Sequence, residues 1–161
     1  MAKANLRARL RDPAPARNAK SGGPSQIAAA ADIKERNDHF IVRNGVRCAG
    51  AHLIVDLYEA ERLDDVDHIE TTLRRCVEEA GATLLHIHLH HFEPNGGVSG
   101  VAVLAESHIS IHSWPERSYA ALDIFMCGKA EPEKCVPVLR EAFKPGRVAV
   151  SELLRGKTSS L

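Results

Sequence analysis

Hydrophobic and polar positions alternate along several segments of the chain after residue 50, as they do in half-buried β-strands. The first such segment is Ala51–Tyr58, and the ordered domain is expected to begin between Phe40 and this segment. Five further segments also resemble strands, at Thr83–Phe92, Val98–Ala105, Ser107–Trp114, Tyr119–Cys127 and Arg147–Leu154. The pattern therefore predicts six strands.

Two segments have apolar residues three and four positions apart, the spacing of an amphipathic helix. In the first, Asp64 or Asp65 can cap the N-terminus, and Gly81 can end the helix in a left-handed conformation. The second fits Glu131–Lys144. Pro137 lies inside this second segment and predicts either a kink or a later start, because proline cannot donate a helical hydrogen bond.

The predicted element order is β-α-β-β-β-β-α-β, with strands that are joined by short links. Such links favour an antiparallel sheet with both helices on one face, which makes residues 41–161 a single two-layer α+β domain. Leu85, Ile87 and Leu89 indicate that the other face of the sheet is also apolar. We expect a second copy of the chain to cover that face, in an α/β/β/α homodimer.

The first forty residues differ from the rest in charge and composition. The first twenty contain six basic residues and one acidic residue, and a stretch rich in proline, glycine and serine follows. Such a segment buries too little apolar surface to offset its chain entropy, so residues 1–40 are predicted to be a flexible basic tail. An Arg-rich, acid-poor leader also resembles an organelle transit peptide, and a role in targeting or in a weak nucleic-acid contact stays open.

The composition of the whole chain excludes several classes of protein. With 21 basic and 21 acidic residues, the formal net charge is zero, which is not typical of proteins that coat nucleic acids. No apolar run reaches the roughly 18 residues that a membrane span needs. The four cysteines have no CxxC spacing and no disulfide framework, which favours a reducing, cytoplasmic setting.

A row of histidines raises the question of a metal site. His86, His88 and His90 point to one face of a predicted strand and His91 follows, and two imidazoles with a carboxylate could hold zinc. The chain lacks the Cys/His spacings that are typical of zinc sites. The row is better explained as hydrogen-bonded polar positions, and no metal is predicted.

Hydroxyls, imidazoles, carboxylates and a thiol are densest between residues 98 and 128. Alternation along the strand predicted at 107–113 places Ser107 on one face and His108 and His112 on the other. No G-x-S-x-G elbow is present, so the serine and the histidines alone do not establish nucleophilic catalysis. Two adjoining strands with solvent-facing polar positions would explain these residues equally well.

The order of the residues in this region is more specific than its composition. The segments Glu106–Glu116 and Tyr119–Gly128 closely resemble the bacterial S-adenosylmethionine decarboxylase proenzymes. The resemblance extends upstream through Gly97–Val101 and His91-Phe92, and it covers roughly residues 48–155. A Glu-Ser-His motif with a downstream His-x-Trp-Pro-Glu and a Cys-Gly carries it.

The resemblance implies that the chain cleaves itself between Glu106 and Ser107. The Ser107 hydroxyl would attack the Glu106 carbonyl, and the chain would separate into a β chain, 1–106, and an α chain, 107–161. Ser107 would become a pyruvoyl group, the cofactor, which forms a Schiff base with the substrate amine. His112 would be the acid and base of processing, and Ser99 would hold the ester intermediate. A strained or polarised peptide at the turn before Ser107 would assist the attack.

The same resemblance implies the substrate and the remaining site residues. The enzyme would convert S-adenosylmethionine to its decarboxylated form and carbon dioxide for spermidine biosynthesis. Cys127 would be the proton donor in catalysis, a role for which a thiol can be tuned. Phe92 would stack on the adenine, and Glu116 would bind the ribose hydroxyls. Family members pair into dimers, in agreement with the uncovered sheet face.

The chain departs from the family pattern around the proposed ribose site. The loop at residues 93–97 is one residue longer than the commonest bacterial form, and Arg117 and Ser118 replace an aromatic residue and glycine beside Glu116. Relatives on this scaffold decarboxylate arginine or ornithine, so the same chemistry on a basic amino acid stays an alternative. A third possibility is a non-catalytic, His-rich binding domain in which Ser107 remains in an intact chain.

Overall fold

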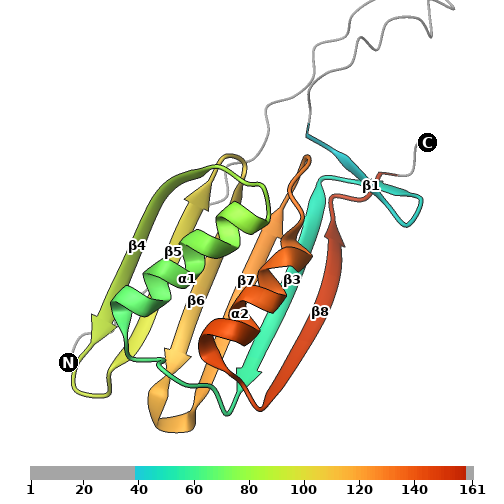
Figure 1. Cartoon of the computed structure of the whole chain (residues 1–161). Helices are drawn as coiled ribbons and strands as arrows, with labels where there is room; N and C mark the ends of the chain where they lie inside the picture. Colours follow the sequence, from blue (N-terminus) through green and yellow to red (C-terminus); the bar gives the residue numbers. More distant parts are fainter. Residues whose placement is uncertain (1–38, 159–161) are drawn as a thin grey trace, which may run out of the picture. The chain divides into compact units, whose positions relative to one another are not determined.

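A six-stranded antiparallel sheet forms the centre of the computed structural model, which describes residues 39–158 (Figure 1). The order of its strands is β4-β5-β6-β7-β3-β8. Their bounds are Gly50–Tyr58 for β3, Leu84–Phe92 for β4, Gly97–Leu104 for β5, Ser107–Trp114 for β6, Tyr119–Met126 for β7 and Arg147–Arg155 for β8. The strand predicted from residue 107 has the observed bounds, β5 is displaced by one residue at both ends, and the others differ by one residue at one end. Most of the predicted basic tail, up to residue 38, lies outside the described residues.

Helices α1 (Val66–Glu79) and α2 (Cys135–Phe143) lie side by side across one face of this sheet (Figure 1). This arrangement confirms the predicted two-layer α+β fold. The Asp65 side chain caps α1 by accepting a hydrogen bond from the His68 backbone N–H at 3.0 Å. This bond and the Arg62 guanidinium lower the pKa of Asp65. The turn after the helix passes through Gly81 at φ +69°, as the sequence predicted.

The second helix begins later than Glu131, the predicted first residue. A short 3-10 helix, η2, covers Pro132–Lys134, and α2 follows it directly. Pro137 is the third residue of α2, where its missing N–H would have no helical partner in any case. The late start therefore satisfies the constraint that Pro137 imposes without a kink.

The core lies between the two helices and the sheet. Alternate residues of the central strands β3, β6 and β7 point into it, as the period of two in the sequence requires. They are Leu53, Val55, Leu57, Ile109, Ile111, Leu122 and Ile124, all almost completely buried. The helices contribute Ile69, Leu73, Cys76, Leu139 and Phe143. A continuous apolar layer thus covers the helix side of the sheet. We call the opposite side, which neither α1 nor α2 covers, the open face.

The prediction that the open face of the sheet is apolar was wrong. Ile87 and Leu89 pack against the core, on the helix side. Leu85 is 63% exposed because the register between β4 and β5 shifts between Leu84 and His86. Strand pairing instead places imidazoles, carboxylates and hydroxyls on the open face, among a few apolar side chains. The polar members include His52, Asp56, His86, His88, His90, Ser99, His108, Ser110, His112 and Asp123.

A two-stranded hairpin of β1 (Ile41–Arg43) and β2 (Val46–Cys48) precedes the sheet and was not predicted. Asn44 and Gly45 form its turn, both at positive φ, which is the Asn-Gly signal of a tight hairpin. Arg43 Nε binds Glu152 Oε1 of β8 at 2.6 Å and so ties the hairpin to the sheet. Within residues 39–158, neither helix has the length and apolar character that crossing a membrane requires.

Candidate active site

The hydroxyl of Ser107 lies beside the thiol of Cys127 at one end of the sheet. Ser107 begins β6, and Cys127 directly follows β7. Ser107 Oγ is 3.7 Å from Cys127 Sγ and accepts a hydrogen bond from the Cys127 backbone N–H at 3.3 Å. A nucleophile and a thiol from neighbouring strands are therefore brought together.

The peptide that precedes Ser107 is strained and polarised. Glu106 has φ +65°, the left-handed region, which costs a non-glycine residue about 1–2 kcal/mol. The Cys127 thiol donates to the Glu106 carbonyl oxygen at 3.3 Å. A donor at this oxygen withdraws electron density from the carbonyl carbon that the adjacent hydroxyl would attack.

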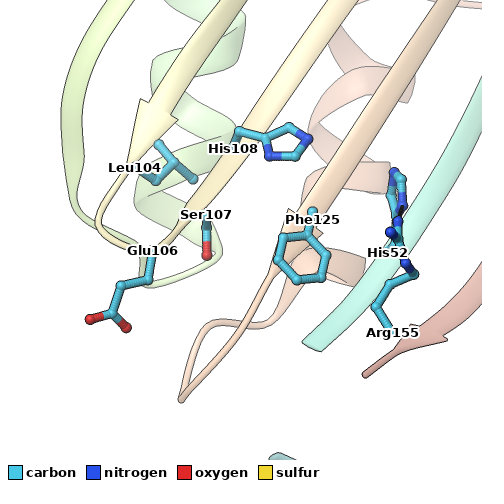
Figure 2. Close-up of a pocket in the computed structure, with 7 residues that line it drawn as sticks. All are labelled: His52, Leu104, Glu106, Ser107, His108, Phe125 and Arg155. Carbon is cyan, nitrogen blue, oxygen red and sulfur yellow. Dashed lines mark hydrogen bonds between the residues drawn. The ribbon is translucent and has the colours of Figure 1, made fainter. Parts of the chain in front are cut away.

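Figure 2 shows a cavity beside this peptide, about 520 Å³ in volume. Its lining residues are His52, Leu104, Glu106, Ser107, His108, Phe125 and Arg155. The volume lies in the range of about 300–1,000 Å³ that is usual for small-molecule sites. The cavity therefore offers space for a substrate directly against Ser107.

Two imidazoles, of His52 and His108, and the Arg155 guanidinium also line this cavity. His52 Nε2 lies 3.2 Å from Asp123 Oδ1, and Arg155 NH1 lies 3.3 Å from His52 Nδ1. Burial, and then the neighbouring His52, lower the pKa of His108, which favours its neutral form. His52 and Arg155 were not predicted as lining residues. No motif marks them, because they come from β3 and β8, far from Ser107 in sequence.

A second group of candidate residues meets at the opposite end of the same strands. Ser99 Oγ is 2.8 Å from His112 Nδ1, across the pairing of β5 with β6. A cavity of about 240 Å³ adjoins them. Its lining residues are Phe92, Asn95, Gly97, Ser99, His112, Ser113, Trp114 and Glu116. Four of the predicted site residues thus surround one space.

The predicted nucleophile and the predicted acid and base do not meet within one chain. Ser107 and His112 lie five residues apart on β6, which at the rise of a strand is about 17 Å. Ser107 lines the larger cavity together with His108, whereas His112 lines the smaller one. The predicted residues therefore form two groups. We call Glu106, Ser107 and Cys127 the cleavage group, and Phe92, Ser99, His112 and Glu116 the imidazole group.

The histidine row on β4 does not assemble a metal site in the part of the chain that the structure describes. No set of three or more His, Cys, Asp or Glu side chains there is arranged to hold a metal ion. His90 instead packs edge-on against Phe92, with ring centroids 4.5 Å apart.

Comparisons with known proteins agree with this geometry. The family model described as S-adenosylmethionine decarboxylase matches residues 51–156. An S-adenosylmethionine decarboxylase proenzyme of Thermomicrobium roseum is 44% identical over 112 residues, which are 69% of this chain and 97% of the relative. One of Methanococcus vannielii is 48% identical over 110 residues, which are 66% of this chain and 89% of the relative.

A solved structure supports the same assignment at the level of the fold. The adenosylmethionine decarboxylase of Aquifex aeolicus superposes with a TM-score of 0.64 at 31% identity. The superposition covers 71% of this chain and 96% of that structure. The sequence match includes both groups of site residues, from Phe92 to Cys127. This chain belongs to the S-adenosylmethionine decarboxylase family.

Proposed function

We propose that this chain is a self-cleaving enzyme that decarboxylates S-adenosylmethionine, yielding carbon dioxide and the decarboxylated sulfonium product used in spermidine synthesis. Family membership supports the substrate. The observation that carries the proposal is the cleavage group itself. A serine hydroxyl adjoins a left-handed peptide whose carbonyl accepts a hydrogen bond from a thiol.

In the first step of cleavage, the Ser107 hydroxyl adds to the Glu106 carbonyl carbon. The carbon–nitrogen bond then breaks, and the hydroxyl proton ends on the Ser107 nitrogen, so that an ester replaces the amide. The Cys127 thiol, 3.3 Å from the carbonyl oxygen, would stabilise the negative charge that develops there. Relief of the left-handed Glu106 conformation would favour the same step.

In the second step, a base removes the Ser107 Cα proton and the Cβ–Oγ bond breaks, releasing Glu106 as a carboxylate. The new N-terminus tautomerises, and water replaces its nitrogen as ammonia. A pyruvoyl group remains at residue 107 as the N-terminus of an α chain of residues 107–161, and residues 1–106 become the β chain. The reaction needs water and no oxidant. An imidazole suits the acid and base steps, and we assign them to His112, with Ser99 as its hydrogen-bonded partner.

The cavity fits a pyruvoyl group at this position. Residue 107 lines it and Cys127 adjoins residue 107, so a proton donor is at hand. Such a group supplies an electron-withdrawing carbonyl that binds the substrate amine covalently. Cys127 would return a proton to the substrate carbon. Phe92 would stack on the adenine and Glu116 would accept hydrogen bonds from the ribose hydroxyls.

The working unit we propose is a homodimer, because one chain separates the cleavage group from the imidazole group. Two copies can pack open face to open face about a two-fold axis perpendicular to the strands. Such an axis near the middle of β6 places the cleavage group of each copy opposite the imidazole group of the other. The mixed polar and apolar character of the open face suits a contact of this kind.

We further propose that residues 41–161 act as a single decarboxylase domain in the cytoplasm. All four cysteines, Cys48, Cys76, Cys127 and Cys135, are free thiols, and three of them are buried. Free thiols persist in a reducing compartment.

Intact mass under denaturing conditions, followed by an assay of carbon dioxide release, tests the proposal. We expect two chains divided between Glu106 and Ser107, and carbon dioxide from carboxyl-labelled S-adenosylmethionine. A single chain after long incubation would contradict self-cleavage. Two chains that release carbon dioxide from arginine or ornithine instead would retain the chemistry and overturn the substrate.

A further inference from the structure

A histidine two residues before the β1–β2 hairpin reaches the cleavage group. His39 Nδ1 lies 2.8 Å from Glu106 Oε2, and the two side chains are 41% and 51% exposed. Glu106 provides the carbonyl that Ser107 would attack. The family model begins at residue 51, so His39 lies in a part of this chain that the family model does not include.

A backbone hydrogen bond also holds His39 in this position. The Gly128 N–H donates to the His39 carbonyl oxygen at 2.8 Å, one residue after Cys127. A Cβ atom at Gly128 would lie 3.3 Å from His39 Nδ1, so glycine permits this close approach. His39 therefore bridges the segments that carry Glu106 and Cys127.

The hairpin that follows His39 is itself attached to the folded domain. Arg43 binds Glu152 of β8 and Glu133 of η2, at 2.6 Å and 3.2 Å. The Thr158 N–H donates to the Arg47 carbonyl oxygen of β2 at 3.0 Å. The position of His39 thus depends on a docked hairpin.

The Glu106 carboxylate is poorly placed for the reaction unless it has a partner. Its Oε2 is 3.9 Å from Cys127 Sγ, and the same thiol donates to the Glu106 carbonyl. Cleavage develops negative charge on that carbonyl and then a second carboxylate on the same residue. An unpaired side-chain carboxylate nearby would raise the free energy of both charges and would compete for the thiol proton.

We propose that His39 is a positioning residue for self-cleavage. It holds the Glu106 carboxylate in the 2.8 Å contact and keeps the carboxylate from competing for Cys127. It acts through Glu106 and does not touch the bond that breaks, unlike the acid and base assigned to His112. The inference rests on the proposed function, because it concerns the rate of that cleavage.

The test is the cleavage rate of full-length chains made by cell-free synthesis, followed by mass spectrometry. We expect His39→Ala to slow cleavage about 10-fold, the scale of one close polar contact with a charged group. His39→Gln, which keeps a donor, should cleave within about 3-fold of the wild type, and added imidazole should accelerate the alanine variant. Once cleaved, all variants should decarboxylate at the wild-type rate per α chain.

Val42→Ala is the matched control, because Val42 lies in the same hairpin with its side chain 68% exposed. It should cleave at the wild-type rate. The inference is wrong if His39→Ala cleaves within 2-fold of the wild type. It is equally wrong if His39→Ala is slow but neither glutamine nor imidazole restores the rate, since the role would then be structural. Absence of cleavage in the wild type would instead overturn the proposed function as well.

Discussion

The two ends of β6 carry different chemistry. At its start, the cleavage group joins a hydroxyl, a thiol and a left-handed peptide, beside the larger cavity (Figure 2). At its end, the imidazole group joins Ser99 to His112 beside an aromatic stack, in which the Trp114 and Tyr119 ring centroids are 5.3 Å apart. The first end can supply a nucleophile and a strained bond, and the second can move protons and hold a flat ligand.

This difference is the reason why we propose a homodimer as the working unit. Neither group contains everything that the reaction needs, and a strand is too rigid to bring its own two ends together. In the homodimer that we propose, a second copy, with its strands running the opposite way, would supply the missing half of each site. The following predictions test how the two ends divide the work.

Loss of the nucleophile should have the largest effect. Ser107→Ala removes the hydroxyl that attacks and the atoms that become the pyruvoyl group, so neither cleaved chain nor decarboxylation should be detected. Denaturing mass spectrometry and carbon dioxide release measure the two outcomes. Ser151→Ala, an exposed position on β8, is the control and should cleave normally. Decarboxylation by Ser107→Ala would falsify the pyruvoyl mechanism.

Mixing two inactive chains should restore cleavage. Ser107→Ala and His112→Ala should each remain uncleaved alone, because each lacks one group in both sites of its dimer. In a mixed dimer, one site pairs Ser107 of one copy with His112 of the other and is intact. Coexpression of equal amounts should therefore cleave about half of the His112→Ala chains, with random pairing of copies.

The measurement is the mass of the His112→Ala chain, which carries a tag that distinguishes it from the Ser107→Ala chain. In the control, the two variants are purified separately and mixed only after denaturation, so that they cannot form a mixed dimer. If coexpression yields no cleaved chain, the two groups act within one copy and the proposed dimer is wrong.

Loss of the thiol should impair decarboxylation more than cleavage. Cys127→Ala removes the proposed proton donor, and the rate per cleaved chain should fall about 100-fold, the usual scale of general acid catalysis. Cleavage should slow less, because the Cys127 backbone N–H still binds Ser107 Oγ. Cys48→Ala serves as the control for a cysteine outside the site. An unchanged decarboxylation rate would assign the proton to another group.

The smallest expected effect is on stability, at the end of β6 that carries the imidazole group. The Tyr119 hydroxyl donates to Asp56 Oδ1 at 2.6 Å, and this bond raises the pKa of Tyr119 to about 12. Tyr119→Phe should lower the free energy of unfolding by about 1 kcal/mol at neutral pH, the usual contribution of one hydrogen bond.

This loss should depend on pH in a defined direction. Between about pH 10 and about 12 the folded chain keeps the Tyr119 proton and the unfolded chain releases it. The contribution is therefore complete below about pH 10 and disappears as the pH rises through this window. Chemical denaturation at several pH values should show the wild type and Tyr119→Phe converging there. A constant difference would mean that the hydrogen bond is not what stabilises this end.

Much of the fold was readable from local pattern. The period of two along Ser107–Trp114 predicted both ends of β6 and the alternation of Ile109 and Ile111 with His108 and His112. The cap at Asp65 and the stop at Gly81 marked the first helix for local reasons of hydrogen bonding and backbone conformation. The composition of the open face was predicted wrongly because the register of β4 with β5 shifts at Leu85, which changes the side chains that lie on that face.

The sequence by itself determined the order of the elements, the face of each central strand that is buried, and the motif that carries the family resemblance. These features depend on neighbours a few residues apart. Only the tertiary structure separated the cleavage group from the imidazole group, placed His39 against Glu106, and placed His52 and Arg155 in the cavity that Ser107 lines. Strand order and register bring such residues together, and they arise from packing between segments as many as 103 positions apart, as in the contact of His52 with Arg155.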